Sequence, residues 1–259
     1  MKLSIVIPAY NEEARLGRML AAYAAYFASK YGDDVELLVI VNGSRDHTAD
    51  VAASFAKQYP CVRVLVEPAP IGKGGAVMLG MRTAVGDFMG FVDADGATPP
   101  EAFDDLLLHI EEAGAIIASR WISGAHVSPR QPLARRIASR LFNLMVKVFF
   151  DLRIHDTQCG AKLLRRDAAL TILPRLGITR WAFDVDLLFQ VRRAGYRVVE
   201  WPTTWCDVSG SRLNVIRASA EMFVALCRLR LLYSPFRWVV TVYDHSIGKI
   251  VHSQTPGVM

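Results

Sequence analysis

An apolar segment that ends in two acidic residues constrains the fold more than any other stretch. Residues 88–92 run directly into Asp93-Ala94-Asp95-Gly96. The segment has the length of a buried strand, and side chains along a strand alternate between its two sides. If the backbone stays extended, Asp93 and Asp95 therefore project to the same side. Two solvated loop acids are the alternative interpretation, because an Asp-x-Asp sequence alone is common.

The position of this acidic pair predicts its chemistry. In an open parallel sheet, ligands bind in the crevice beyond the carboxyl ends of the strands. Carboxylate oxygens placed there suit Mg²⁺ or Mn²⁺ that arrives with a phosphorylated substrate. Beyond the pair, we expect Thr98 as a helix N-cap, Pro99 as the first helical residue and Glu101 as the reciprocal capping partner.

Strand patterns alternate with helix patterns before this segment. Asn11 is the expected N-cap of the first helix, because acidic residues follow it in the first turn. The connections are short, which indicates an α/β fold with a mainly parallel central sheet and helices on both faces. Strands are expected at residues 3–7, 35–41 and 62–66. Three helices are expected: the first ends near Lys30, the second runs from about Thr48 to Gln58, and the third ends near Ala84.

A glycine-rich loop at residues 71–75 lacks the spacing of a phosphate-binding P-loop. The chain also lacks the Gly-x-Gly-x-x-Gly pattern of a dinucleotide dehydrogenase after its first strand. Lys73 remains, at the expected N-terminus of a helix, which is a suitable place for an anion. A flexible turn with a solvated lysine is the alternative.

The length of 259 residues allows one large α/β domain or one domain with an appendage. Residues 213–233 come closest to a membrane span, but charged residues such as Arg217, Glu221 and Arg228 interrupt them. A strand is expected from Leu3, so we expect no signal peptide. The four cysteines lack metal-site spacing, and we expect reduced thiols in a cytoplasmic protein.

The net charge is concentrated in one segment. Between Arg130 and Arg166 there are nine Lys and Arg residues against two acids, whereas residues 87–112 hold eight acids and no Lys or Arg. A basic block beside an acidic site of metal type suggests anionic partners. We do not expect nucleic acid among them, because the sequence contains no nucleic-acid-binding motif.

Two segments have the pattern of amphipathic helices that lie on a membrane surface. The first, at about residues 132–150, combines apolar residues at helical spacing with a basic stripe. The second, at about residues 216–233, repeats the combination. A helix packed on the domain with its arginines in water is the alternative. In the first helix the apolar set is Leu133, Ile137, Leu141, Leu144, Met145 and Val148, and the polar stripe is Arg136, Arg140, Asn143 and Lys147.

Several blocks stand in order along the chain: residues 8–12 (PAYNE), 42–48 (NGSRDHT), 72–74 (GKG), 93–95 (DAD), 119–120 (SR), 156–164 (DTQCGAKLL), 180–188 (RWAFDVDLL), and Trp205 with residues 210–213 (GSRL). Together they resemble the inverting family 2 glycosyltransferases with the GT-A fold. The later blocks resemble the dolichyl-phosphate β-glucosyltransferase branch, with the dolichyl-phosphate mannose synthases close behind. The resemblance covers residues 3–233, and residues 234–259 are expected to form a C-terminal extension.

This resemblance implies a role for each matching residue. Asp93 and Asp95 would hold the donor diphosphate through the metal, with Asp95 the more direct ligand. The implied nucleotide-sugar contacts are Pro8, Ala9, Tyr10, Glu12, Asn42, Ser44, Lys73, Asp93, Ala94 and Asp95. The implied catalytic residues are Asp95, Arg120, Gln158, Lys162 and Asp184, and the acceptor phosphate would meet Arg120, Arg136, Ser139, Arg140 and Asn143.

Two positions depart from the family pattern. Val41-Asn42 stands where an acidic pair is usual, and a carboxylate there commonly reads the base, so the identity of the base is less secure. Ala161 replaces an aromatic residue, which would widen the pocket. The roles of Asp184 and Asp186 stay open, since an acid in this region is the base in relatives that act on sugar hydroxyls. Trp181 is expected either to stack on the sugar or to lie in the core.

The resemblance implies transfer of a hexose, with glucose from UDP-glucose preferred, to a polyprenyl phosphate with inversion. A lipid monophosphate is mostly ionised near neutral pH, because its second pKa is about 6, so it needs no dedicated general base. The enzyme would work as a peripheral protein on the cytoplasmic face of a membrane. The alternatives are transfer of mannose or another sugar, a catalytically silent membrane-surface protein that binds nucleotide sugars, and a nucleotidyltransferase.

Overall fold

The structure is a computed structural model that describes residues 2–129, 133–177, 182–206, 215–238 and 240. Trp181 and residues 210–213 lie outside the described residues, as does most of the expected extension at 234–259. The predictions that concern them therefore stay predictions.

A seven-stranded sheet forms the centre of the described chain, in the order β3-β2-β1-β4-β7-β5-β8. All neighbours pair in parallel except β7, which is antiparallel to both β4 and β5. The prediction of a mainly parallel sheet is confirmed. The strands are β1 (Leu3–Ala9), β2 (Val35–Asn42), β3 (Val62–Glu67), β4 (Phe88–Phe91), β5 (Ala115–Ser119), β7 (Lys162–Arg165) and β8 (Val198–Pro202), and a separate parallel pair joins β6 (His126–Ser128) to β9 (Thr204–Cys206).

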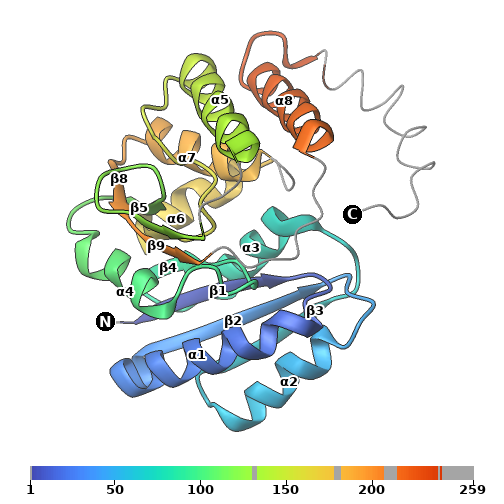
Figure 1. Cartoon of the computed structure of the whole chain (residues 1–259), viewed down its shortest axis with the longest axis vertical. Helices are drawn as coiled ribbons and strands as arrows, with labels where there is room; N and C mark the ends of the chain where they lie inside the picture. The colour runs from blue at the N-terminus through green and yellow to red at the C-terminus, as the bar shows by residue number, and fades with distance from the viewer. Residues whose placement is uncertain (1, 130–132, 178–181, 207–214, 239, 241–259) are drawn as a thin grey trace.

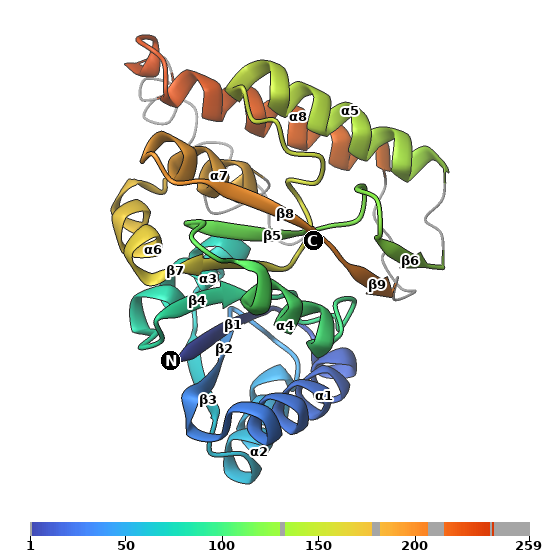
Figure 2. The ribbon, with the colours of Figure 1, turned by 90° about the vertical axis from the view of Figure 1, so that its left-hand side faces the viewer.

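Helices cover both faces of the sheet, as predicted, and each face has its own buried cluster (Figure 2). Helix α1 illustrates the cause, because its buried residues Leu16, Leu20, Tyr23 and Phe27 recur at helical spacing. One face carries α1 (Glu13–Tyr31), α2 (Thr48–Gln58) and α4 (Pro100–His109), while the other carries α3 (Gly72–Thr83), α6 (Arg166–Ile172) and α7 (Phe183–Arg193); short 3₁₀ helices lie at Gly32–Asp34 and Leu173–Arg175.

Two of the expected helix caps are wrong by one residue. Pro99, not Thr98, is the N-cap of α4, and no side chain caps this helix, so Glu101 is not a capping partner. Pro99 is extended, at φ −65° and ψ 156°, because a residue that precedes a proline is kept out of the helical region. At α1 the N-cap is Glu12. Asn11 instead accepts the backbone N–H of Arg45 at 2.9 Å.

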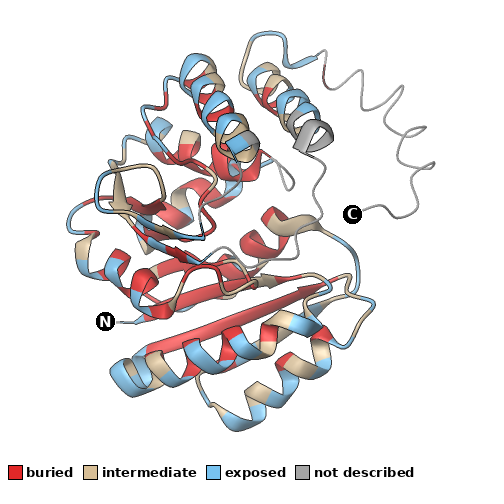
Figure 3. Cartoon of the chain, in the orientation of Figure 1, coloured by how far each residue is buried: buried red, intermediate tan, exposed pale blue. Residues whose placement is uncertain are grey.

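Helices α5 (Leu133–Phe150) and α8 (Val215–Leu232) lie side by side at the end of the molecule farthest from α1 and α2 (Figures 1 and 2). Helix α5 packs inward through Phe142, Val146 and Phe150, and α8 packs through Leu226 and Leu229. The outward faces of both helices are largely exposed (Figure 3). The exposed apolar residues of α5 are Leu133, Ile137, Leu141, Leu144 and Val148.

This packing corrects part of the amphipathic-helix prediction. Five of the six apolar residues predicted for α5 are exposed, and only Met145 is partly buried against the core. On α8, however, Leu226 and Leu229 face the core, and the exposed apolar residues are Phe223 and Val224. In the described part of the chain, no helix is both long enough and apolar enough to cross a membrane.

Candidate active site

The two predicted metal ligands lie just beyond the end of β4. Val92 and Ala94 are only 1% and 3% exposed, whereas Asp93 and Asp95 are half-buried, so both carboxylates face away from the core. The backbone does not stay extended, because it turns at Ala94 and Asp95. Asp95 Oδ1 closes this turn by accepting the backbone N–H of Ala97 at 2.9 Å. The carboxylates are thus held by a turn and not by a continued strand.

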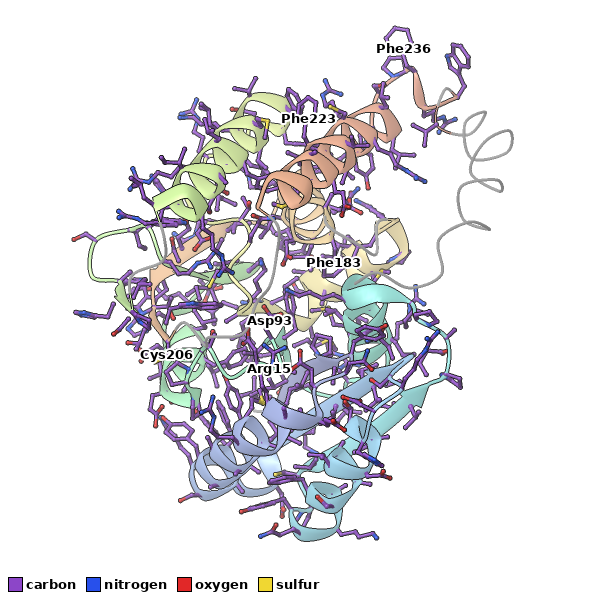
Figure 4. The ribbon with its side chains drawn as sticks, turned by 45° about the vertical axis from the view of Figure 1, so that its right-hand side comes forward. Arg15, Asp93, Phe183, Cys206, Phe223 and Phe236 are labelled. Atoms are coloured by element: carbon purple, nitrogen blue, oxygen red, sulfur yellow. The ribbon has the colours of Figure 1, made fainter. Side chains whose placement is uncertain are left out.

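Two lysines and two aspartates from separate elements form an ion-pair cluster beside this turn. Lys73, in the first turn of α3, places Nζ at 2.8 Å from Asp93 Oδ1 and 3.7 Å from Asp184 Oδ2. Lys162, at the start of β7, donates to Asp184 Oδ1 at 2.6 Å and to the Cys159 carbonyl at 2.7 Å. Figure 4 shows Asp93 near the centre of the molecule, between the α5–α8 pair and α1.

Two glycines allow this cluster to form. A Cβ atom added to Gly160 would lie 2.0 Å from Asp93 Oδ2, so only a glycine lets the 156–161 segment pass this carboxylate. A Cβ atom at Gly74 would lie 2.5 Å from the Phe183 ring, and Phe183 directly precedes Asp184. The glycines of residues 72–75 therefore let α3 approach α7, which brings Lys73 to Asp184.

Arg120 follows β5 and is held by Asp156. The guanidinium donates from Nε to Asp156 Oδ2 at 2.7 Å and from Nη2 to Asp156 Oδ1 at 2.9 Å. The Trp205 ring lies 4.8 Å from the Arg120 guanidinium carbon. Asp156 is completely buried, so this bidentate pair fixes the direction of Arg120.

Burial and nearby charges shift the pKa values of three carboxyl groups at the site. Burial, followed by the nearby charge of Asp93, raises the pKa of Asp95 above its usual value. Burial also raises the pKa of Glu12, against the opposing effect of Arg15, and the charges of Asp95 and Asp93 contribute. Burial acts in the same direction on Asp184, but the ammonium groups of Lys162 and Lys73 outweigh it and lower the pKa of Asp184.

The loops after β1 and β2 meet at the same edge of the sheet. Ser44 Oγ accepts the backbone N–H of Asn11 at 3.1 Å, and Asn42 Nδ2 donates to the Ala9 carbonyl at 3.2 Å. Glu12 forms an ion pair with Arg15 at 2.6 Å. The structure thus brings together the residues expected to bind the nucleotide. Pro8, Tyr10 and Ser44 are partly exposed there, whereas Ala9, Asn42 and Ala94 are buried.

The four residues on α5 that were expected to bind the acceptor phosphate separate into two groups. Asn143 is buried, and its Oδ1 accepts both the backbone N–H of Thr157 at 3.1 Å and the Thr157 hydroxyl at 2.7 Å. These contacts favour a positioning role for Asn143. Ser139 Oγ is buried and has no hydrogen-bond partner in the part of the chain that the structure describes, which leaves it available to a ligand. Arg136 is half-buried and Arg140 is exposed.

Lys162 and Gln158 differ in how far they are exposed to a substrate. Lys162 is completely buried beneath Asp184, which favours a role in holding that carboxylate over direct contact with substrate. Gln158 is partly exposed, between the buried residues Thr157 and Cys159. Asp186 lies away from the cluster, because its carboxylate accepts the Tyr233 hydroxyl at 2.6 Å and the Gly177 backbone N–H at 3.2 Å.

Sequence reasoning assigned no role to Asp156. One signal could have identified it, because Asp156 is one of only two acids among the basic residues 130–166. A buried acid surrounded in sequence by arginines is a strong candidate for an ion-pair partner.

The carboxylates of Asp93 and Asp95 fit a divalent metal ion whose coordination is completed by the substrate. In the described residues, no group of three or more His, Cys, Asp or Glu side chains could hold a metal ion by itself. Asp93 and Asp95 offer hard oxygen ligands. Mg²⁺ characteristically binds through one or two carboxylates together with substrate phosphates, so this pair matches such an ion.

Comparison with known proteins decides the family. The model of "Glycosyl transferase family 2" matches residues 4–173. The chain belongs to this family. It is therefore a glycosyltransferase, and the resemblance stated from its sequence blocks is confirmed.

Curated relatives match over most of the glycosyltransferase chain. The dolichyl-phosphate beta-glucosyltransferase of Drosophila melanogaster is 35% identical over 251 residues, covering 92% of this chain and 77% of the relative. The enzymes of that name from Dictyostelium discoideum and Homo sapiens are 33% and 32% identical, again over 92% of this chain and over 76% and 77% of theirs.

Solved structures confirm the GT-A fold. Glucosyl-3-phosphoglycerate synthase from Mycobacterium tuberculosis in complex with UDP superimposes with a TM-score of 0.67 at 18% identity, covering 90% of this chain and 82% of the other. A complex of that synthase with Mn²⁺ and UDP-glucose superimposes with a TM-score of 0.65 at 18% identity, covering 88% of this chain and 78% of the other. At this identity the likeness concerns the fold alone.

Proposed function

We propose that this glycosyltransferase transfers glucose from UDP-glucose to a dolichyl-type polyprenyl phosphate, with inversion at the anomeric carbon and with Mg²⁺ or Mn²⁺ as cofactor. The observation that carries the proposal is the cluster of Asp93, Asp95 and Lys73 at the carboxyl edge of the sheet, in a chain whose relatives are named dolichyl-phosphate beta-glucosyltransferases.

The donor would lie across the loops that follow β1, β2 and β4. Pro8, Tyr10 and Ser44 are the partly exposed residues near the nucleotide, and Asp93 and Asp95 would hold the metal that binds the diphosphate. When bound, this metal neutralises charge that builds up on the leaving diphosphate. Lys73 is 34% exposed and can turn from Asp93 towards a phosphate oxygen, where its charge stabilises the same leaving group.

The acceptor phosphate would enter from the side of α5. Ser139 Oγ has no hydrogen-bond partner among the described residues, and Arg120 supplies a fixed positive charge. The ionised phosphate attacks the anomeric carbon opposite the leaving diphosphate, which inverts the configuration. Asp184 need not act as a base in this scheme, and its lowered pKa makes it a poor one. We propose that Asp184 and Lys162 orient Lys73.

We further propose that the enzyme is a peripheral protein on the cytoplasmic face of the membrane, docked through α5 and α8. The exposed leucines of α5 lie beside a basic stripe, the pattern of a helix at the membrane–water interface. Phe223 on α8 and Phe236 beyond it are also exposed, at the outer end of the molecule in Figure 4.

Radiolabelled UDP-glucose and polyprenyl phosphate test the activity. We expect label to move into an organic-extractable lipid, and Asp95→Asn to reduce transfer by about 100-fold or more, because an electrostatic contact in the transition state is lost. Asp105→Asn, an exposed position on α4, is the matched control. Transfer from GDP-mannose only, or release of pyrophosphate from a nucleoside triphosphate, would contradict the proposed donor. If calorimetry with Mn²⁺ detects no nucleotide-sugar binding, the protein is a silent relative.

Vesicle flotation tests the docking surface. We expect Leu141→Asp to weaken binding to vesicles while leaving transfer to a soluble short-chain acceptor unchanged, because Leu141 is 55% exposed on α5. Leu108→Asp is the control, since Leu108 is 59% exposed on α4, on the opposite face of the sheet. Equal flotation of both variants would contradict docking through α5.

A further inference from the structure

A pocket lies beside α5, apart from the ion-pair cluster. Its volume is about 280 Å³, close to the roughly 300 Å³ at which small-molecule sites begin. Arg140, Lys147 and His155 line it together with Trp121 and Leu144. None of the residues Lys73, Asp93, Asp184, Lys162 or Arg120 lines it, so the pocket does not form part of the proposed donor site.

The pocket is built for an anion. No acidic residue in the described chain lines it, and no carboxylate there pairs with Arg140 or Lys147. The Arg140 guanidinium carbon lies 5.5 Å from the centre of the Trp121 ring, which holds the long side chain in place. His155 is fixed as well, because its Nδ1 lies 2.8 Å from Glu200 Oε2. The indole N–H of Trp121 is buried and has no hydrogen-bond partner among the residues that the structure describes.

The position of the pocket beside the exposed apolar stripe of α5 indicates that the anion belongs to a membrane lipid. Arg140, Leu144 and Lys147 recur at helical spacing, so one helical face carries both charges and an apolar residue. Leu144 is 55% exposed and belongs to the same exposed apolar stripe as Leu141 and Val148. A ligand with a phosphate in the pocket could therefore continue over Leu144 onto an apolar surface, as a membrane lipid does.

The contact between Asn143 and Thr157 adjoins the pocket. Asn143 also lines the pocket, and its Oδ1 is occupied by Thr157. Residues 154–155 precede this contact in the chain and face the pocket, whereas Gln158 and Gly160 follow it towards Asp93. Lys73 and Lys162, which pair with Asp93 and Asp184, do not line the pocket.

We propose that this pocket binds the phosphate headgroup of an anionic bilayer phospholipid that is not a substrate, and that it orients α5 on the membrane. The inference rests on the proposed function, in that the enzyme works at a bilayer. A headgroup bound in this pocket adds a specific contact to the apolar contact that α5 makes with the membrane. It thereby keeps the reaction centre facing the membrane surface.

Binding of the full-length protein to vesicles tests the proposal. We expect tighter binding to phosphatidylcholine mixed with phosphatidylglycerol than to phosphatidylcholine alone, and about a fivefold loss of that preference in Lys147→Gln. Arg153→Gln is the matched control, because Arg153 follows the same helix and is exposed but does not line the pocket. Trp121→Leu should also reduce the preference although it leaves the net charge unchanged. Equal losses in Lys147→Gln and Arg153→Gln, with none in Trp121→Leu, would show diffuse attraction and overturn the proposal.

Two further measurements separate the other possible ligands. Without vesicles, Lys147→Gln should keep the wild-type KM for a soluble short-chain polyprenyl phosphate; a raised KM would show that the pocket is the seat of the acceptor. Calorimetry with inorganic phosphate tests for a soluble ligand. Phosphate binding that Lys147→Gln abolishes, with equal binding to both vesicle types, would exclude the lipid. If the wild type transfers no sugar at all, the proposed function fails, and the vesicle comparison still decides the pocket.

Discussion

Gly160→Ala is the substitution whose effect can be worked out most directly. The added Cβ would lie 2.0 Å from Asp93 Oδ2, 2.5 Å from Asp93 Cγ and 3.2 Å from Asp93 Cβ. Gly160 is buried, and the contacts come from the short side chain of Asp93, which is itself paired with Lys73 at 2.8 Å. Real Cβ contacts are almost always longer than 3.0 Å, so the carboxylate must move by about 1 Å or more.

A displacement of this size has a predictable cost. Misplacement of a reacting group by about 1 Å can reduce the rate about 100-fold, which corresponds to about 2.7 kcal/mol of transition-state stabilisation. We therefore expect kcat/KM to fall about 100-fold in Gly160→Ala, and the Mn²⁺ concentration that supports half-maximal rate to rise. Steady-state transfer of radiolabel at several Mn²⁺ concentrations measures both.

Two controls test whether the effect of Gly160→Ala arises from the contact with Asp93. Gly17→Ala adds a methyl group within α1, where the nearest atom would be 3.6 Å away, so it should retain full activity. In a double mutant, Gly160→Ala should add little to the loss already caused by Asp93→Ala, because both act on the same carboxylate. Wild-type kinetics in Gly160→Ala, or full additivity in the double mutant, would refute the argument that Gly160 is required by Asp93.

Other predictions concern single side chains of the site. Because the pKa of Asp95 is raised, its carboxylate takes up a proton at a higher pH than an ordinary aspartate does. As the pH is lowered, the Mn²⁺ affinity measured by calorimetry should therefore begin to fall at a higher pH than it would with an ordinary aspartate, and Asp95→Asn should remove this dependence. Asn143→Ala leaves the Thr157 backbone N–H unpaired, so it should lower kcat while changing the KM for UDP-glucose little; a raised KM for the acceptor alone would instead indicate a phosphate ligand. Burial raises the pKa of Cys159 to about 12, so iodoacetamide at pH 8 should label Cys206, which is exposed, and leave Cys159 unmodified in a mass-spectrometric assay.

Local patterns predicted most of the fold because they depend on neighbours in sequence. The buried strands and the helix from Thr48 to Gln58 follow from apolar periodicity, and β2 and α2 lie within one residue of their expected bounds. The missed N-cap of α4 was also local, because Pro100 restrains Pro99, and this restraint is readable in the sequence. The antiparallel direction of β7 was not readable, since it depends on how the 156–161 segment returns to the sheet.

The sequence predicted which residues belong to the site, but it did not predict the contacts that these residues make with distant segments. Asn143 belongs to a polar stripe on a basic helix, and the family resemblance implied that it is a phosphate ligand. Its contact with Thr157, fourteen positions along the chain, arises only from the return of the chain after α5. Lys73 was expected at a helix N-terminus and lies there, but its pairing with Asp184 depends on the approach of α3 to α7. Contacts between distant segments decide roles that single blocks leave open.

The formal charges at the candidate active site explain why the chain would need a divalent cation for the proposed reaction. Four carboxylates, Asp93, Asp95, Asp156 and Asp184, lie among three cations, Lys73, Arg120 and Lys162, which leaves a formal charge of three minus four, or −1. Both substrates proposed here bring further negative charge to the same place. The three cations are already paired with carboxylates, so they alone cannot neutralise a diphosphate and a phosphate together. Asp93 and Asp95 would hold a divalent ion, whose two positive charges would change the formal charge of these side chains from −1 to +1 and would offset part of the negative charge that the substrates bring.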